Sequence, residues 1–344
     1  MRRIIVLGGF GFFGSVIVQS LRAAGLTPLI GSRRSSAELT IDVEDGDSIR
    51  RILRPGDVVV DAVGPYQLRT TQLVDSAIEL GFDVVDLADS LSYVRSVYAL
   101  KQRIDAAEIR VFTACSGMSS ISAAMIRLSG FADPVRLTGF LVPVTRQTAV
   151  AGTAASLFCS VGRPIQVFQD GALASRSGWN STRSFPMPSP VQTRTGYLFE
   201  TADAITLPPL WPSLQTVEFF VDTNVRGLNM GFVLAARFPT LRKLMEKLQK
   251  PGLRLSRVLG RSFGGLGYEI EGAAGQVVRL AFTAERQGYV TAIAPTVLVA
   301  QRLAEDRTEE RGLITPDQHI DPEELVQYLE KHDVTFSSSA PLQS

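Results

Sequence analysis

Short apolar runs alternate with longer amphipathic segments through the first third of the chain. Such runs are typical of strands buried on both faces of a parallel sheet, and the segments between them have helical periodicity. We predict strands over Ile4–Leu7, Leu26–Ile30, Asp57–Ala62, Asp83–Leu87 and Arg110–Thr113. Helices are predicted over Phe12–Ala24, Asp45–Leu53, Thr70–Leu80 and Ser92–Ala107. This alternation predicts an α/β fold, a Rossmann-like doubly wound parallel sheet of five strands.

The pattern changes after about Phe131. Strands are now predicted over Val135–Val144, Pro164–Gln169, Gln215–Val221, Tyr268–Gly272 and Gln276–Ala284. Between them, Ser175–Pro212 has weak periodicity and is expected to be a long excursion over the sheet or a cleft lid. We therefore expect a nucleotide-binding domain over 1–130, completed by C-terminal helices over about 289–335. A second α+β domain over 131–288 would serve substrate binding or dimerisation, and 336–344 would be a frayed tail.

A basic amphipathic segment lies inside the second domain. Pro239–Lys250 is predicted to be helical, with Leu241, Leu244, Met245 and Leu248 on one face. A solvated helix packed on the domain is the default interpretation, and a membrane-surface or lipid-facing role is the alternative.

The first predicted strand is followed by a glycine-rich turn. Gly9, Gly11 and Gly14 form G-x-G-x-x-G between a strand and a helix, the pattern of a dinucleotide phosphate loop. The first glycine permits a tight turn, the second a close approach of the pyrophosphate, and the third close packing of helix on strand. The predicted cofactor contacts in this loop are Gly9, Phe10, Gly11, Phe12, Phe13 and Gly14.

The end of the second predicted strand indicates which dinucleotide would bind. NAD sites commonly place an acidic residue there to bind the ribose 2′-hydroxyl. This chain has Gly31, Ser32, Arg33 and Arg34 instead. Because two guanidinium groups can hold a 2′-phosphate, NADP is the predicted cofactor, with Ser32, Arg33 and Arg34 as contacts. The alternative is a pair of solvated surface arginines.

Composition narrows the class of protein further. The 344 residues carry 35 Lys and Arg against 34 Asp and Glu, a formal net charge of +1 that predicts no nucleic-acid partner. Two cysteines give neither a disulfide framework nor a metal cluster, so we expect no metal and a reducing, cytoplasmic setting. The basic, apolar N-terminus resembles a signal peptide, but its glycines fit a phosphate loop better. No apolar run is long enough for an integral membrane segment.

Four segments together resemble the saccharopine dehydrogenase-like (saccharopine reductase-type) NADP-binding oxidoreductases. Val58–Tyr66 is similar to their VVNAAGPY element and Asp83–Ser90 to their YVDLADD element. Cys115–Ser120 is similar to the loop after their fifth strand, and Gly288–Ala292 to their late GYxTA segment. The resemblance covers about residues 1–131 and 289–306. It implies a Rossmann-like domain with an inserted α+β domain and NADP-linked hydride transfer to a small C=N or activated C=C substrate.

The resemblance also implies roles for single residues. Gly64, Pro65 and Tyr66 would lie against the nicotinamide ribose and the substrate, with Tyr66 as a hydrogen-bonding catalytic candidate. Asp89 would hold a substrate amino group or pair with an iminium, the second catalytic candidate. The alternatives are packing for Tyr66, and a helix cap formed by Asp89 or Ser90.

The loop after the fifth strand is expected to reach the cofactor as well. Cys115 would line the cofactor pocket as a thiol, since both histidines, His319 and His332, lie far along the chain. Ser116 and Ser119 would contact the nicotinamide carboxamide, or alternatively cap a helix over Ser120–Leu128. No Ser-His-Asp or Tyr-x-x-x-Lys arrangement is found.

Two further functional interpretations remain open. An NADP-binding regulator or scaffold without turnover would keep the phosphate loop but lack a proton donor. A lipid-linked enoyl reductase would explain the aromatic excursion and the basic helix. For the leading interpretation, the expected partners are a small-molecule substrate and a second copy of the chain in a homodimer.

Overall fold

The computed structural model describes residues 2–339, which divide into two compact units. The first unit contains residues 2–120 and 292–321, and the second contains residues 121–291 and 322–339. The expected nucleotide domain was to extend to about 335. The chain instead enters the second unit at Pro322, because the strand that follows pairs with that unit's sheet.

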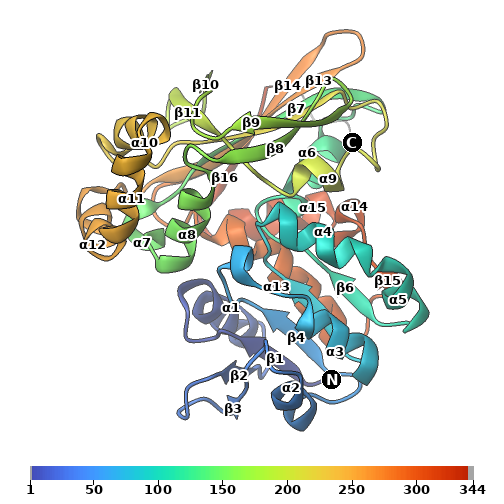
Figure 1. The fold of residues 1–344 in the computed structure, drawn as a ribbon. Helices are drawn as coiled ribbons and strands as arrows, with labels where there is room; N and C mark the ends of the chain where they lie inside the picture. The colour runs from blue at the N-terminus through green and yellow to red at the C-terminus, as the bar shows by residue number, and fades with distance from the viewer. Residues whose placement is uncertain (1, 340–344) are drawn as a thin grey trace. The chain divides into compact units, whose positions relative to one another are not determined.

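The first unit is built on a fully parallel sheet, with strand order β15-β6-β5-β4-β1-β2-β3 among the described residues. The central order 3-2-1-4-5-6 is that of a Rossmann fold, which confirms the predicted fold class. The strands are β1 (Ile4–Leu7), β2 (Leu29–Ser32), β3 (Leu39–Thr40), β4 (Val58–Asp61), β5 (Asp83–Asp86), β6 (Arg110–Phe112) and β15 (Gly312–Leu313). Figure 1 shows this sheet with its helices.

The core of the first unit explains the apolar runs. Every residue of β1, β4 and β5 is buried, as expected for strands covered on both faces. Burial of each Ile, Leu or Val side chain contributes about 1.5–3 kcal/mol. The polar exceptions are Asp83, which begins β5, and Asp61 and Asp86, which end β4 and β5 at the carboxyl edge of the sheet.

The helices of the first unit follow the predicted alternation, with one correction. They are α1 (Phe12–Ala23), α2 (Gly46–Ile52), the 3-10 turn η1 (Tyr66–Leu68), α3 (Gln72–Leu80), α4 (Leu91–Ala99), α5 (Lys101–Ala106), α13 (Val290–Ala304) and α14 (Pro316–His319). The single helix predicted over Ser92–Ala107 is wrong. Leu100 leaves helical geometry at φ −88° and ψ 1°, which divides the segment into α4 and α5.

The second unit is built on a mixed sheet in the order β10-β11-β12-β7-β13-β14-β16, with β8 pairing β12 and β9. The parallel pair is β7 with β12, and the other pairs are antiparallel. The strands are β7 (Pro134–Val142), β8 (Pro164–Gln169), β9 (Ala172–Ser177), β10 (Thr182–Phe185), β11 (Arg194–Phe199), β12 (Thr216–Val221), β13 (Gly264–Gly272), β14 (Val277–Ala284) and β16 (Thr335–Ser338). The helices are α6 (Ser120–Leu128), α7 (Thr145–Thr148), α8 (Ala151–Ser160), α9 (Asp203–Thr206), α10 (Leu228–Arg237), α11 (Pro239–Lys247), α12 (Gln249–Leu259) and α15 (Pro322–Glu330).

Two expectations for the second unit are wrong. The excursion over Ser175–Pro212 contains β10, β11 and α9, and the buried Trp179 stacks on Tyr197 there. The expected frayed tail begins as a strand, because β16 pairs with β14 through Phe336 and its neighbours. Residues 340–344 of that tail lie outside the described residues.

Candidate functional site

The glycine turn connects β1 to α1 with very little space around it. Gly8 adopts the left-handed region at φ +73°, and the N–H of Gly11 donates to the Gly8 carbonyl at 2.8 Å. A Cβ on Gly14 would lie 2.2 Å from that same carbonyl oxygen. Since no side chain tolerates such an approach, Gly14 allows α1 to pack directly on the turn, as the third glycine of the motif predicts.

The N-terminus of α1 carries the positive end of the helix dipole. Gly11, the N-cap residue, forms no side-chain cap, and the first turn holds no acidic residue. Gly11, at the cap position, is extended and exposed. A helix N-terminus that follows a glycine turn can bind a phosphate group, and the residues present fit a pyrophosphate.

A pocket of about 390 Å³ opens beside this turn. The segments that follow β1, β2, β3 and β4 line it with Gly8, Gly31, Ser32, Arg33, Ile41, Asp42, Val43, Glu44, Val63, Gly64, Pro65, Leu68 and Arg69. The pocket therefore lies at the carboxyl edge, where the strand order reverses between β1 and β4. Rossmann folds bind their ligands at this position.

Of the predicted cofactor contacts, Ser32, Arg33, Gly64 and Pro65 line this pocket. Arg33 and Arg34 are exposed, and the guanidinium of Arg34 lies over the Phe10 ring at 5.5 Å from its centroid. The Arg34 N–H donates to the Ser32 hydroxyl at 3.3 Å. Phe10, between Gly9 and Gly11, thus connects the phosphate loop to the arginine segment. Arg33 places a positive charge at the pocket, whose lining also includes the acidic residues Asp42 and Glu44.

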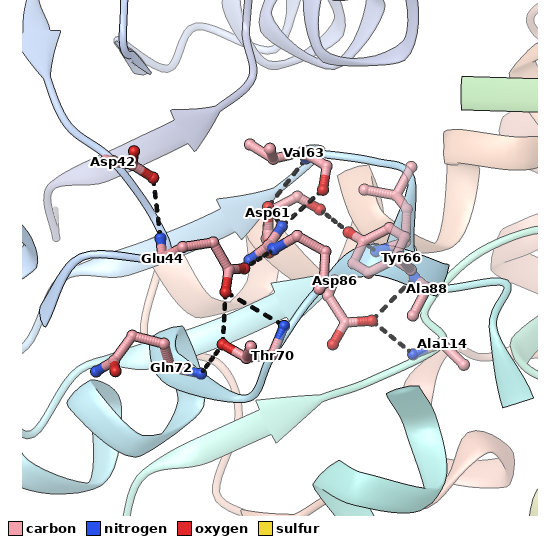
Figure 2. A network of polar contacts seen from close by, with 12 residues as sticks. Asp42, Glu44, Asp61, Val63, Tyr66, Thr70, Gln72, Asp86, Ala88 and Ala114 are labelled. Atoms are coloured by element: carbon pink, nitrogen blue, oxygen red, sulfur yellow. Dashed lines mark hydrogen bonds and ion pairs between the residues drawn. The ribbon is translucent and has the colours of Figure 1, made fainter. Parts of the chain in front are cut away.

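A buried ion pair supports one wall of the pocket, and Figure 2 shows the network of polar contacts around its carboxylate, Asp61. Arg69 Nη2 lies 3.0 Å from Asp61 Oδ2, with 5% and 0% of the two side chains exposed. Arg69 also donates to the Val63 carbonyl at 2.6 Å and to the carboxylate of Glu44. The Asp61 carboxylate accepts from the Val63 N–H at 2.9 Å. Arg69 therefore joins the segment after β4 to the segment after β3.

The hydrogen bonds of Tyr66 favour the packing alternative. Its side chain is 5% exposed, and the hydroxyl donates to the Asp61 carbonyl at 2.6 Å and accepts from the Leu87 N–H at 3.2 Å. Burial, together with the carboxylates of Asp61 and Asp86, raises the pKa of the phenol, which keeps it neutral. A hydroxyl with both partners inside the protein is poorly placed to reach a substrate.

Asp89 follows β5 at the same edge and is half-buried. Gln67 Nε2 donates to its Oδ1 at 3.3 Å. The helix cap proposed for Asp89 or Ser90 is formed by Ser90, whose hydroxyl accepts from the Tyr93 N–H at 3.4 Å. Asp89 is thus not the N-cap residue of α4, and its role at the substrate stays a prediction.

The loop after β6 is largely buried, and its predicted cofactor contacts stay predictions. Cys115 is fully buried, and burial raises the pKa of its thiol to about 12. Ser116 is 7% exposed, and neither side chain is among those that line the pocket. In the same loop, Ala114 and Ser119 both adopt positive φ.

His319 contacts this same loop, and this contact was not predicted from the sequence. Its Nδ1 lies 2.7 Å from the Ser120 hydroxyl, and its Nε2 lies 3.1 Å from the Ile314 carbonyl. The carbonyl accepts only, so Nε2 carries the proton and Ser120 donates to Nδ1. Burial lowers the pKa of His319 to about 4 from its ordinary 6.5. Its contribution to stability is therefore lost as pH falls from about 6.5 through about 4.

Asp86 has the opposite shift in the same pH range. The backbone N–H groups of Ala88 and Ala114 donate to its Oδ1 at 3.0 and 2.9 Å, which Figure 2 shows at the end of β5. Burial outweighs these hydrogen bonds and raises the pKa of Asp86 to about 6 from its ordinary 3.8. Protonated Asp86 thus favours the folded state, and this contribution is lost as pH rises through about 6.

Replacing Asp86 by Asn isolates this contribution. The amide oxygen can accept both backbone N–H groups, while no charge forms at any pH. We expect the free energy of unfolding of D86N, relative to the wild type, to rise by about 2 kcal/mol between pH 4 and 7. Urea denaturation at both pH values measures the difference, and a difference that is flat with pH means that Asp86 has an ordinary pKa.

No helix among residues 2–339 is long and apolar enough to cross a membrane. No protein-family model matches this sequence, and no curated protein matches it either.

The solved structures nevertheless include similar folds. Apo saccharopine dehydrogenase (L-glutamate-forming) from Saccharomyces cerevisiae matches with a TM-score of 0.62 at 14% identity, covering 99% of this chain and 100% of that chain. A dehydrogenase (MviM) from Clostridium difficile matches with a TM-score of 0.42 at 6% identity, covering 96% and 99%. Myo-inositol 2-dehydrogenase from Lactobacillus plantarum matches with a TM-score of 0.42 at 9% identity, covering 99% of both chains. The first comparison confirms the resemblance drawn from the sequence at the level of the fold.

Proposed function

We propose that this chain is an NADP-dependent oxidoreductase that transfers a hydride between the nicotinamide and a small molecule with a C=N or activated C=C bond. The main observation in support is the pocket at the carboxyl edge of the parallel sheet, whose strand order is 3-2-1-4-5-6. Arg33 is one of the residues that line this pocket. The turn over residues 31–34 contains no carboxylate that would repel a 2′-phosphate. The fold shared with saccharopine dehydrogenase is consistent with this chemistry.

Different residues of the first unit would bind different parts of the cofactor. The glycine turn and the N-terminus of α1 would hold the pyrophosphate, and Arg33 and Arg34 would hold the 2′-phosphate. When bound, the nicotinamide supplies the hydride, so the protein needs no covalent group of its own. The protein must instead position the acceptor carbon and provide a proton or a charge partner.

Asp89 is the remaining candidate for that charge partner, since the hydroxyl of Tyr66 is used inside the protein. We expect Asp89→Asn to keep the hydrogen bond from Gln67 and to lower turnover by about 10²-fold or more, with little change in NADPH affinity. Steady-state kinetics together with calorimetric NADPH binding measure the two effects separately. Wild-type turnover in D89N would remove Asp89 from the site.

Single-turnover oxidation of NADPH tests whether the chain is an enzyme. Stopped-flow absorbance is followed with a panel of cyclic imines, keto acids with amines, and enones. Faster NADPH oxidation with an imine or an enone supports the proposal and identifies the bond type. NADPH binding without acceleration by any member supports the alternative of a regulator without turnover, which the burial of Tyr66 keeps open. The cytoplasmic location and the homodimer remain predictions from the sequence.

A further inference from the structure

Three consecutive helices of the second unit, α10, α11 and α12, expose an unusual amount of apolar surface. Figure 1 shows them together in orange beside α7 and α8. Neither α11 nor α12 contains a buried side chain, although both are amphipathic. Helices in soluble proteins ordinarily bury their apolar stripe. Two successive amphipathic helices without a fully buried side chain therefore indicate a surface that serves binding.

The inner side of this helical group is anchored to the unit. Phe232 and Ala235 of α10 pack in one buried cluster with Trp179, and Leu241 and Met245 of α11 pack against that cluster. Two arginines add polar anchors to main-chain carbonyls: Arg242 donates to Gly162 at 2.8 Å and Arg257 to Ala149 at 2.9 Å. The orientation of the three helices on the unit is therefore defined, and so is the face that they present outward.

The outward face carries large apolar side chains at helical spacing. On α10 and the residue that follows it, Met230, Leu234 and Phe238 recur every four residues. The exposed set, between 41% and 72% accessible, is Met230, Leu234, Phe238, Leu244, Leu248, Leu255, Val258 and Leu259. We call these eight residues the apolar face.

Positive charge surrounds the apolar face. Residues 226–261 contain nine Lys and Arg and a single acidic residue, Glu246, which pairs with Arg163 at 2.9 Å. The remainder of the chain then holds 26 basic and 33 acidic residues. The net charge of the whole protein is close to zero, but this one surface is strongly basic. Lys243, Lys247, Lys250 and Arg254, among others, are exposed there.

We propose that the apolar face and its basic surroundings bind the surface of an anionic phospholipid bilayer. Exposed Leu, Met, Val and Phe side chains would enter the region between headgroups and acyl chains, while Lys and Arg contact the phosphates. With 9 to 11 residues, α11 and α12 would lie in the plane of the membrane.

Charge and composition favour a bilayer over two other occupants. A second copy would bring the same positive charge against the first, which disfavours self-association through this face. The core of a protein interface is depleted in charged residues and in Lys, whereas residues 226–261 contain nine Lys and Arg, three of them lysines. Aliphatic side chains among lysines and arginines match a lipid interface instead.

Vesicle flotation with the full chain tests the proposal. The wild type is mixed with vesicles of phosphatidylcholine alone or with one third phosphatidylglycerol. We expect binding to the anionic vesicles and at least tenfold weaker binding to the neutral ones. High salt should weaken the bound state, because added ions screen the attraction. Cofactor is absent, so the result does not depend on the proposed hydride transfer.

Two double variants separate the apolar and the basic contributions. L244S/L255S removes two exposed leucines, and K243E/K247E reverses two exposed lysines. Each should reduce binding to anionic vesicles by about tenfold or more. Matched controls on the exposed strand β9 of the same unit, Leu173→Ser and Arg176→Glu, should bind like the wild type. All four variants change exposed side chains, and equal thermal unfolding midpoints confirm intact folding.

Three results would overturn the proposal. The first is no binding to anionic vesicles, which would leave an acidic protein as the occupant. The second is binding that the double variants and the controls lose equally. The third is a dimer in analytical ultracentrifugation that L244S/L255S dissociates, because this would show that a second copy covers the apolar face.

Discussion

Replacement of Arg69 by alanine is expected to lower the free energy of unfolding by about 3–5 kcal/mol. The loss leaves the carboxylate of Asp61, which is 0% exposed, without its cation. It also releases the segment after β3, because Arg69 holds both the Val63 carbonyl and the carboxylate of Glu44. The pocket wall should then loosen, and NADPH affinity should fall together with stability.

An exposed arginine serves as the matched control for this variant. Arg50 forms ion pairs with Asp47 and Glu79, but its side chain is 44% exposed. Arg50→Ala should leave the denaturation midpoint nearly unchanged, since exposed ion pairs contribute little. Arg69→Lys should fall between the two, because an ammonium cannot reproduce the several directed hydrogen bonds of a guanidinium. A midpoint of R69A equal to that of R50A would contradict a buried ion pair.

Replacement of Gly14 by alanine is expected to lower NADPH affinity by about 10- to 100-fold. The new Cβ would lie 2.2 Å from the Gly8 carbonyl oxygen, which is backbone and cannot rotate away. The helix α1 must then move off the turn, and the N–H groups at its N-terminus move away from the pyrophosphate. Calorimetric titration with NADPH measures the loss.

The matched control for this variant is another helical glycine. Gly152 lies in α8, and a Cβ built there meets nothing within 4 Å. Gly152→Ala should bind NADPH like the wild type. If G14A binds NADPH as tightly as G152A does, the glycine turn is not the pyrophosphate site.

The strands of the first unit could be predicted from the sequence because their burial on both faces leaves unbroken apolar runs. The two edge strands, β3 and β15, contain only two residues each, and no periodicity can be recognised over so short a length. In the second unit, the strands between Ser175 and Pro212 are polar on one face and separated by Ser- and Pro-rich turns. Their pattern is therefore weak although their pairing is regular.

Some parts of the candidate site could likewise be predicted from the sequence, and others could not. The phosphate loop could be predicted because all its residues are adjacent in the chain. The ion pair of Asp61 and Arg69 with Glu44 could not, since it joins segments that meet only at the sheet edge. The contact of His319 with Ser120 spans 199 positions. It depends on α14, which has four residues and is too short to show helical periodicity. The burial of Tyr66 and Cys115 likewise follows from three-dimensional packing.

The preference between NADPH and NADH tests the central claim most directly. Isothermal titration of the wild type and of the double variant R33A/R34A is made with both dinucleotides. Charge-assisted hydrogen bonds to a 2′-phosphate predict NADPH binding at least about tenfold tighter than NADH binding by the wild type. The double variant should lose that preference by weakening NADPH alone, with NADH affinity unchanged. Equal affinities of the wild type for the two dinucleotides, or an unchanged preference in R33A/R34A, would contradict the assignment of this site to NADP.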